Sequence, residues 1–251
     1  MTSSNQTYKT FADYYDIYVR NYSEDLAFYL SLCSNEYKIL EVGCGTGRIL
    51  QYVLDNGLKI TGIDISEEML KKARTKLKNY IENKKLFLFN HNLSDKPFKE
   101  LFHVCIISFY TFNYILEKPE IFLNHLYKSL HKDSIIAIDL FYPSIFNNPA
   151  IDDVWIDKEF NYHERLIRIR DKRTFKENIE NRVQVYHDNG HDTHIETLRR
   201  YYPPDEIKHL LLETGFTNIE FSAVFDQNGF QSGIDEEKIN RNYIVKARKQ
   251  L

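Results

Sequence analysis

The stretch from Lys38 to Gly47 constrains the fold most, because it joins a short apolar strand to a turn with a glycine at every second position. It reads Lys-Ile-Leu-Glu-Val-Gly-Cys-Gly-Thr-Gly, and an amphipathic helical pattern follows. Glycine admits backbone conformations closed to other residues, and the first turn of a helix offers free N–H groups. The pattern predicts a strand that turns sharply into a helix beneath a ligand.

A dinucleotide site and a turn without any ligand are the competing interpretations of this stretch. A dinucleotide site requires a third glycine three places after Gly45, and that place is Arg48. Glu41 would repel a pyrophosphate, whereas a carboxylate at a strand end suits a cation or a hydroxyl. The spacing and the charge therefore favour a positively charged ligand that carries a ribose.

The stretch Glu41-Val42-Gly43-Cys44-Gly45-Thr46-Gly47 resembles the signature of class I S-adenosylmethionine (SAM) dependent methyltransferases. The resemblance implies SAM as the cofactor, and it implies that the turn binds SAM through Glu41, Gly43, Cys44, Gly45 and Gly47. A second strand, residues 59–64, ends in Asp64, which lies 21 residues after Gly43. An acidic residue at about this spacing binds the ribose hydroxyls in nucleotide-binding βαβ units, so we expect Asp64 to do so.

Further cofactor contacts follow from the same resemblance. It places Ile65 and Met69 against the adenine ring, and it places Asn92 where the family usually has an aspartate that accepts from the adenine amino group. Asparagine accepts through its carbonyl oxygen, so this departure is tolerable. Leu93 and Phe109 complete the expected set of cofactor-binding residues.

The hydrophobic pattern predicts an α/β fold, a Rossmann-like seven-stranded methyltransferase sheet flanked by helices. Apolar runs predict the third to fifth strands at 86–89, 103–109 and 134–140, and two last strands at about 218–225 and 242–248. Residues 155–201 alternate instead, with a hairpin signal at Asn189-Gly190, which predicts a small antiparallel β insertion after the fifth strand. We therefore expect residues 1–140 and 202–251 to form the SAM-binding core, with a helical lid over 1–36, and residues 141–201 to form a lid or substrate subdomain.

Tyrosines supply the candidates for catalysis. A stripe of aromatic residues between Phe11 and Tyr22 recurs at helical spacing, and Ser23 is the expected N-cap of a second helix. This stripe is typical of core packing, but the family resemblance places Tyr15 near the cofactor. We expect Tyr15 and Tyr110 near the methyl group, where aromatic rings attract a cation. Tyr110, His163 and His187 are the candidates for a general base.

The hairpin His187-Asp188-Asn189-Gly190-His191-Asp192-Thr193-His194 contains metal-ligand residue types. Pairing across a two-residue turn places His187, Asp192 and His194 on one face. Polar residues of exposed hairpins are far more often solvated than metal-bound, so we predict no metal site.

Charge and composition exclude several classes of partner. The 33 Lys and Arg residues against 36 Asp and Glu give a net charge of −3, which provides no general attraction for nucleic acid or an anionic membrane. No apolar run approaches the roughly 20 residues of a membrane span, and the first residues lack the apolar core of a signal peptide. The prediction is a cytoplasmic protein, a monomer or homodimer, that binds neither nucleic acid nor a membrane.

The whole layout resembles small-molecule methyltransferases, including the dTDP-amino-sugar N-methyltransferases. The resemblance implies in-line transfer of the SAM methyl group to a nitrogen or oxygen of a small-molecule acceptor, which leaves S-adenosylhomocysteine. The loop after the fourth strand, residues 110–114, lacks the Asn/Asp-Pro-Pro-Tyr/Phe pattern of many enzymes that methylate planar nitrogens. Two alternatives stay open, an RNA or protein acceptor and a SAM-binding protein without catalysis.

Overall fold

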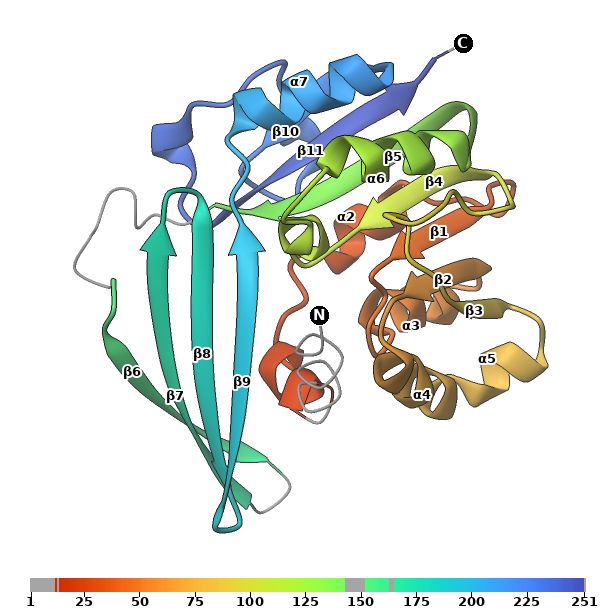
Figure 1. Ribbon diagram of the computed structural model, residues 1–251. Coiled ribbons are helices and arrows are strands. Elements are labelled where there is room, and N and C mark those ends of the chain that lie inside the picture. The colour runs from red at the N-terminus through yellow and green to blue at the C-terminus, as the bar shows by residue number, and fades with distance from the viewer. Residues whose placement is uncertain (1–11, 13, 143–151, 163–164, 251) are drawn as a thin grey trace.

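The computed structural model describes residues 12, 14–142, 152–162 and 165–250. Its larger sheet has seven strands in the order β10-β11-β5-β4-β1-β2-β3 (Figure 1). Strand β11 runs antiparallel to both of its neighbours, and the other neighbouring pairs are parallel. The strands are β1 (Ile39–Val42), β2 (Ile60–Asp64), β3 (Leu86–Asn90), β4 (Phe102–Ile107), β5 (Leu130–Phe141), β10 (Phe216–Ser222) and β11 (Asn242–Lys249). The predicted seven-stranded α/β fold is confirmed.

Strand β5 begins earlier than the sequence predicts. It starts at Leu130 rather than at Ser134, and the pairing register with β4 shifts between Phe102 and Val104. Lys132 and Asp133 at this end are exposed. Because exposed polar residues carry no hydrophobic signal, the periodicity identified only the buried part of the strand.

Helices cover both faces of the large sheet. Helices α2 (Leu26–Ser31), α3 (Arg48–Asp55) and α4 (Glu67–Lys76) share one apolar cluster with the strands, and α6 (Pro119–Lys128) and α7 (Pro204–Thr214) share the other. Shorter helical segments are α5 (Lys78–Glu82), η1 (Thr111–Tyr114), η4 (Gln227–Gly229) and η5 (Glu236–Lys238). The Ser66 side chain caps α4 by accepting from the Met69 N–H. The expected cap at Ser23 is wrong, because α2 begins only after Asp25 and that carboxylate pairs with Arg48 instead.

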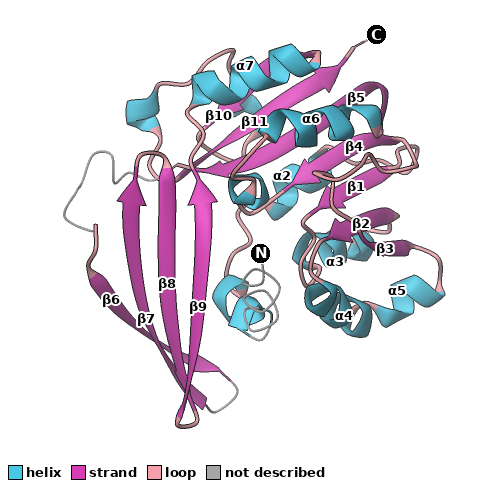
Figure 2. Ribbon diagram, viewed as in Figure 1, coloured by secondary structure: helices cyan, strands magenta, loops and turns pink. Residues whose placement is uncertain are grey.

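The second sheet has four antiparallel strands in chain order (Figure 2). They are β6 (Trp155–Tyr162), β7 (Arg165–Lys176), β8 (Ile179–Asp188) and β9 (His191–Arg200). Asn189 and Gly190 take φ angles of 50° and 79° between β8 and β9, and Asp188 pairs with His191. Positive φ at both residues is typical of a tight hairpin turn. The predicted antiparallel insertion after the fifth strand is confirmed.

A short N-terminal helix, residues 14–19, connects the two sheets. Its Ile17 is buried in an apolar cluster with Ile167, Ile169, Tyr186 and Ile195 of the inserted sheet. On the core side, the Thr46 hydroxyl donates to the Asp16 carboxylate at 2.6 Å. Figure 1 shows this helix between the inserted sheet and the α4 side of the core. The helix is thereby fixed directly beside the glycine turn.

The buried amide of Asn113 joins the inserted sheet to the core at its other end. Its Nδ2 donates to the carbonyl oxygens of Phe141 and Arg200, at 3.1 and 2.7 Å, and its Oδ1 accepts from the Phe141 N–H at 2.8 Å. These bonds hold the loop after β4 against the ends of β5 and β9.

Among the residues described, no helix is both long and apolar enough to cross a membrane.

Candidate active site

The glycine turn lies at the carboxyl end of β1, where the strand order changes direction between β1 and β4. Open α/β sheets bind their ligands at such a switch point. Gly43, Gly45 and Gly47 have φ angles of 70°, 53° and 86°, a region that other residues rarely adopt. A Cβ on Gly43 would lie 2.4 Å from the Thr111 Cγ2, whereas a Cβ on Gly45 would make ordinary van der Waals contact with the Tyr15 ring at 3.6 Å. Gly43 is therefore required for packing, and the Tyr15 ring lies directly over Gly45.

Asp64 ends β2 beside this turn. Its Oδ2 accepts from the Gly45 N–H and its Oδ1 from the Ser66 N–H, both at 2.8 Å. Burial raises the pKa of the Asp64 carboxyl above its ordinary value, although these two N–H groups oppose that shift. Each oxygen keeps a lone pair for another donor, so the carboxylate can accept from two neighbouring hydroxyl groups.

Glu41 lies on β1 and is 1% exposed. Its Oε1 accepts from the Ser108 hydroxyl at 3.1 Å, and its Oε2 has no hydrogen-bond partner in the described part of the chain. Burial raises the pKa of Glu41 to about 8, against the opposing effect of the Arg48 guanidinium. An unpartnered buried carboxylate oxygen is costly, and a bound cation would satisfy it.

The loop after β4 holds an aromatic cluster around Phe109. Phe109 and Tyr110 have φ angles of 47° and 65°, a strained conformation for large side chains that concentrates at ligand sites. The rings of Tyr15, Tyr18 and Tyr22 meet the Phe109 ring edge-on, with centroids 5.3 to 6.3 Å away. The cluster places aromatic rings over the glycine turn, where they can face a cation.

The two tyrosines predicted near the methyl group are neutral phenols. Burial raises the pKa of Tyr15 and of Tyr110 far above the ordinary tyrosine value. The Tyr110 hydroxyl has no hydrogen-bond partner among the described residues. A phenol that stays protonated can donate a hydrogen bond or pack against a ligand, but it is a poor proton acceptor at neutral pH.

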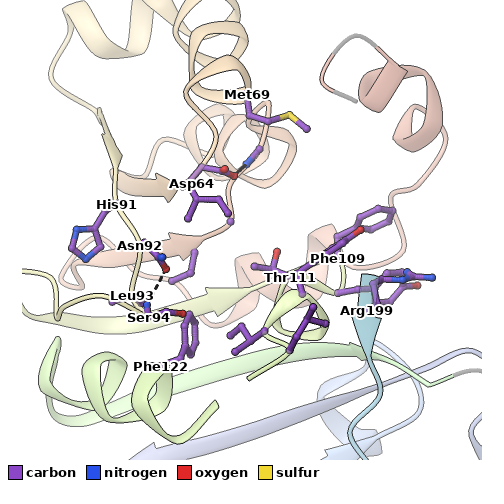
Figure 3. A pocket seen from close by; sticks show the side chains of 18 of the residues that line it. Asp64, Met69, His91, Asn92, Leu93, Ser94, Phe109, Thr111, Phe122 and Arg199 are labelled. Atoms are coloured by element: carbon purple, nitrogen blue, oxygen red, sulfur yellow. Dashed lines mark hydrogen bonds between the residues drawn. The ribbon is translucent and has the colours of Figure 1, made fainter. Parts of the chain in front are cut away.

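A cavity of about 330 Å³ lies between the glycine turn, the N-terminal helix and the inserted sheet (Figure 3). It brings together most of the predicted site residues, namely Tyr15, Gly43, Gly45, Asp64, Ile65, Met69, Asn92, Leu93, Phe109 and Tyr110. Glu41, Cys44 and Gly47 do not line it, and the Cys44 side chain is buried against Gly62. His163 lies outside the described residues. The roles of all these residues in binding or catalysis stay predictions.

Asn92 lines the cavity, and its side-chain oxygen already accepts one hydrogen bond. Its Oδ1 accepts from the Ser94 N–H at 2.9 Å, a bond that Figure 3 marks. The same oxygen has a second lone pair, so the expected contact with an adenine amino group is still available to it.

Several further residues line the cavity that were not predicted from the sequence. These are Tyr18, Val42, His91, Ser94, Thr111, Tyr114, Ile115, Leu116, Glu117, Phe122, Arg182 and Arg199. Arg182 and Arg199 matter most chemically, because they are charged and come from the inserted sheet. Local sequence gives no signal for them, because polar residues that alternate along β8, namely Glu180, Arg182 and Gln184, are typical of a solvent face, yet all three are buried.

The hairpin histidines do not gather into a metal site. His187 hydrogen-bonds Asp192 directly across the hairpin. Within the described residues, no group of three or more His, Cys, Asp or Glu side chains is placed to hold a metal ion.

Comparison with known proteins points to one class. Residues 40–136 match the family model of a methyltransferase domain. A methyltransferase of Geobacillus sp. is 26% identical over 196 residues, which cover 75% of this chain and 77% of that protein. The CcbJ methyltransferase of Streptomyces caelestis has the same fold, with a TM-score of 0.78 and 18% identity over 98% of each chain. The sugar N-methyltransferase KedS8 of Streptoalloteichus sp. follows with a TM-score of 0.71 and 13% identity, over 94% of this chain and 93% of that one.

The strand order, the glycine turn and the family match together define a class I methyltransferase fold. Residues 40–136 are similar to a methyltransferase domain, and the sequence relatives carry the name methyltransferase. The site fits SAM on three observations: the unpartnered Glu41 oxygen suits a cation, the Asp64 carboxylate suits a pair of hydroxyls, and the backbone of Gly43 and Gly45 lines the cavity without side chains.

Proposed function

We propose that the protein transfers the methyl group of SAM to a nitrogen or oxygen of a small molecule. The observation that carries this proposal is the make-up of the cavity, in which Gly43 and Asp64 of the core, Tyr15 and Tyr18 of the N-terminal helix, and Arg182 of the inserted sheet share one space. An acceptor surrounded by three structural elements is shielded from water, and such enclosure suits a small molecule better than a polymer. The likeness to a sugar N-methyltransferase fold supports the same class of acceptor.

We assign the cofactor to the end of the cavity that contains Asp64. There Asp64 accepts from the ribose hydroxyls, Ile65 and Met69 flank the adenine ring, and Asn92 accepts from its amino group. The Glu41 carboxylate beneath the turn attracts the positive charge of the cofactor. Leu93 and Phe109 supply apolar contact, and the turn of Gly43, Cys44, Gly45 and Gly47 provides backbone contacts.

When bound, SAM supplies a methyl group on a positively charged sulfur, which an unprotonated nitrogen or oxygen of the acceptor takes up. The protein's part is alignment and exclusion of water, which can lower the barrier by roughly 7 kcal/mol or more. Tyr15 and Tyr110 position the reactants as neutral phenols. His163 stays our candidate for a general base, because histidine is the side chain that most often takes this role near neutral pH.

Three broader statements stay predictions. We propose that residues 1–140 and 202–251 form the cofactor-binding unit, with residues 1–36 as its lid, and that residues 141–201 form the acceptor subdomain. We also expect a cytoplasmic protein that acts as a monomer or homodimer. Size-exclusion chromatography with light scattering measures the oligomeric state.

Calorimetric titration tests the cofactor, and transfer of a labelled methyl group tests the acceptor class. SAM and S-adenosylhomocysteine should bind and NADH should not, and Asp64→Ala should abolish binding. Tritiated SAM is then incubated with the protein and a bacterial extract that ultrafiltration has divided into small molecules and macromolecules. Label in the small-molecule fraction is expected. Label in protein or RNA contradicts a small acceptor, and tight SAM binding without transfer to either fraction favours a non-catalytic SAM-binding protein.

A further inference from the structure

Two buried arginines from the inserted sheet line the cavity at the end away from the glycine turn. Arg182 on β8 is 6% exposed, and Arg199 on β9 is 4% exposed. Figure 3 shows Arg199 across the cavity from Asp64 and Asn92. If the cofactor occupies the Asp64 end, as the proposed function requires, the arginine end receives the acceptor.

The counter-ions of these arginines lie behind them. Arg182 binds both oxygens of Asp171, at 2.8 and 2.7 Å, and the Arg199 Nε donates to Glu180 at 2.6 Å. Neither carboxylate lines the cavity, so the arginines stand between the carboxylates and the space for a ligand. A guanidinium has five N–H donors, and the hydrogen bonds to Asp171 or Glu180 use only part of them.

This cluster of charges has a positive excess. Arg173 also faces both carboxylates, at 3.5 Å from each, and the Lys158 ammonium lies 3.5 Å from Asp171. Three guanidinium groups and one ammonium therefore surround two carboxylates. Lys158 and Arg173 are partly exposed, with 40% and 22% of their side chains accessible, so water screens part of this excess and an anion in the cavity would offset the rest.

The pKa of Tyr18 reflects the positive electrostatic potential that these arginines create inside the cavity. Its ring lies under the Arg182 guanidinium, 5.4 Å from its central carbon. Burial by itself raises the pKa of Tyr18, but Arg182, Arg173 and Arg199 outweigh burial and lower that pKa below the ordinary tyrosine value. Half-buried Tyr114, which also lines the cavity, has a raised pKa, because burial outweighs the effect of Arg199 and Arg182 there. The arginines therefore act most strongly on Tyr18, whose ring lies against Arg182.

We propose that this end of the cavity binds an oxyanion, a carboxylate or an ionised hydroxyl of the acceptor, through Arg182 and Arg199. Only the identification of this ligand as the methyl acceptor depends on the proposed function. The arginine site itself belongs to the protein whether or not SAM is bound. An acceptor without negative charge would leave the excess positive charge of the cluster without a partner.

Anion binding is measured by calorimetry at low ionic strength, with and without S-adenosylhomocysteine. The probes are benzoate for a carboxylate, 4-nitrophenolate for an ionised hydroxyl and benzamide as the neutral analogue of benzoate. At least one anion should bind at least about tenfold more tightly than benzamide, since a hydrogen bond to a charged group is worth about a factor of ten or more.

The decisive variant is the double substitution Arg199→Gln with Glu180→Gln, which removes both charges of one buried pair and leaves no orphaned carboxylate. It should weaken anion binding about tenfold. Arg173→Gln is the matched control, because Arg173 belongs to the same charge cluster but does not line the cavity. Its anion affinity should fall far less. Circular dichroism melting verifies that both variants fold.

The proposal is overturned if neither anion binds, if benzamide binds as well as the anions, or if the double variant keeps the affinity of the wild type. Stronger benzoate than nitrophenolate binding identifies a carboxylate, and the reverse identifies an ionised hydroxyl. Loss of S-adenosylhomocysteine binding with retained anion binding contradicts the proposed function and leaves the arginine site standing.

Discussion

We expect Glu41 to make the affinity for SAM rise with pH. Its pKa of about 8 means that roughly one tenth of the carboxyl groups are ionised near pH 7 and roughly nine tenths near pH 9. Only the ionised form attracts a cation. The contribution of Glu41 should therefore tighten SAM binding about tenfold between these two pH values, or about 1.4 kcal/mol.

Glu41→Gln isolates this contribution. The amide oxygen can still accept from the Ser108 hydroxyl, so the packing and one hydrogen bond of the buried side chain are retained. The amino group of SAM also titrates in this range, but it does so equally for both proteins. The ratio of wild-type to variant affinity, measured by calorimetry, should thus rise about tenfold from roughly pH 7 to roughly pH 9.

Proton release is an independent measurement of the ionisation of Glu41 on SAM binding. Near pH 7 the wild type should release almost one proton more than Glu41→Gln when SAM binds, measured by calorimetry in buffers of different ionisation enthalpy. Glu100→Gln makes the same change at an exposed carboxylate that is paired with Lys38. This variant should leave the pH dependence of SAM affinity and the number of protons released unchanged from the wild type. An affinity ratio that stays flat with pH, with no extra proton, would refute the placement of Glu41 beside the positive charge of SAM.

Three further outcomes follow from the same geometry. Asp64→Asn places an amide NH₂ against the N–H of Gly45 or of Ser66, so SAM affinity should fall about a hundredfold by calorimetry, whereas Glu67→Gln on the exposed surface should leave it unchanged. Gly43→Ala should lower the free energy of unfolding in urea by about 2 kcal/mol more than Gly57→Ala, because both glycines have positive φ but only Gly43 meets a neighbour, Thr111. Burial raises the pKa of Glu41 to about 8 and that of Asp139 to about 7, so the folded protein holds these protons more tightly than the unfolded chain, whose carboxyl groups titrate at about 4. The contribution of these protons to stability is complete at low pH and is lost as pH rises through about 8. The free energy of unfolding of the wild type should therefore fall more steeply than that of Glu41→Gln between about pH 5 and 8. Equal slopes of this free energy against pH would contradict the raised pKa of Glu41.

The half of the site that we assign to the cofactor was predictable because its signals are local. Gly43, Gly45 and Asp64 can be identified from a strand, three alternating glycines and an acidic residue at a fixed spacing after them. This pattern requires no knowledge of the rest of the chain. The helix caps at Ser66 and Gly215 were predictable for the same reason, since each depends on a few neighbouring residues.

The acceptor half was not predictable from local pattern. Glu180, Arg182 and Gln184 alternate as the solvent face of a strand does, yet all three are buried because the N-terminal helix and the core cover that face. That burial depends on contacts between residues far apart in the chain, such as Asp16 with Thr46. The left-handed backbone at Phe109 and Tyr110 is equally invisible in the sequence, because neither residue type favours it.

The opposite charges of the two ends of the cavity bear on the chemistry. Asp64 makes the end assigned to the cofactor negative, Glu41 adds to that charge as it ionises through its pKa of about 8, and Arg182 and Arg199 make the other end positive. Transfer of a methyl cation equivalent to an oxyanion brings opposite charges together and neutralises them, whereas transfer to a neutral amine only moves the positive charge. Exclusion of water by the helix and the inserted sheet strengthens charge attraction inside the cavity. We therefore expect an anionic acceptor rather than a neutral amine, and we expect the arginines of the inserted sheet to decide acceptor specificity.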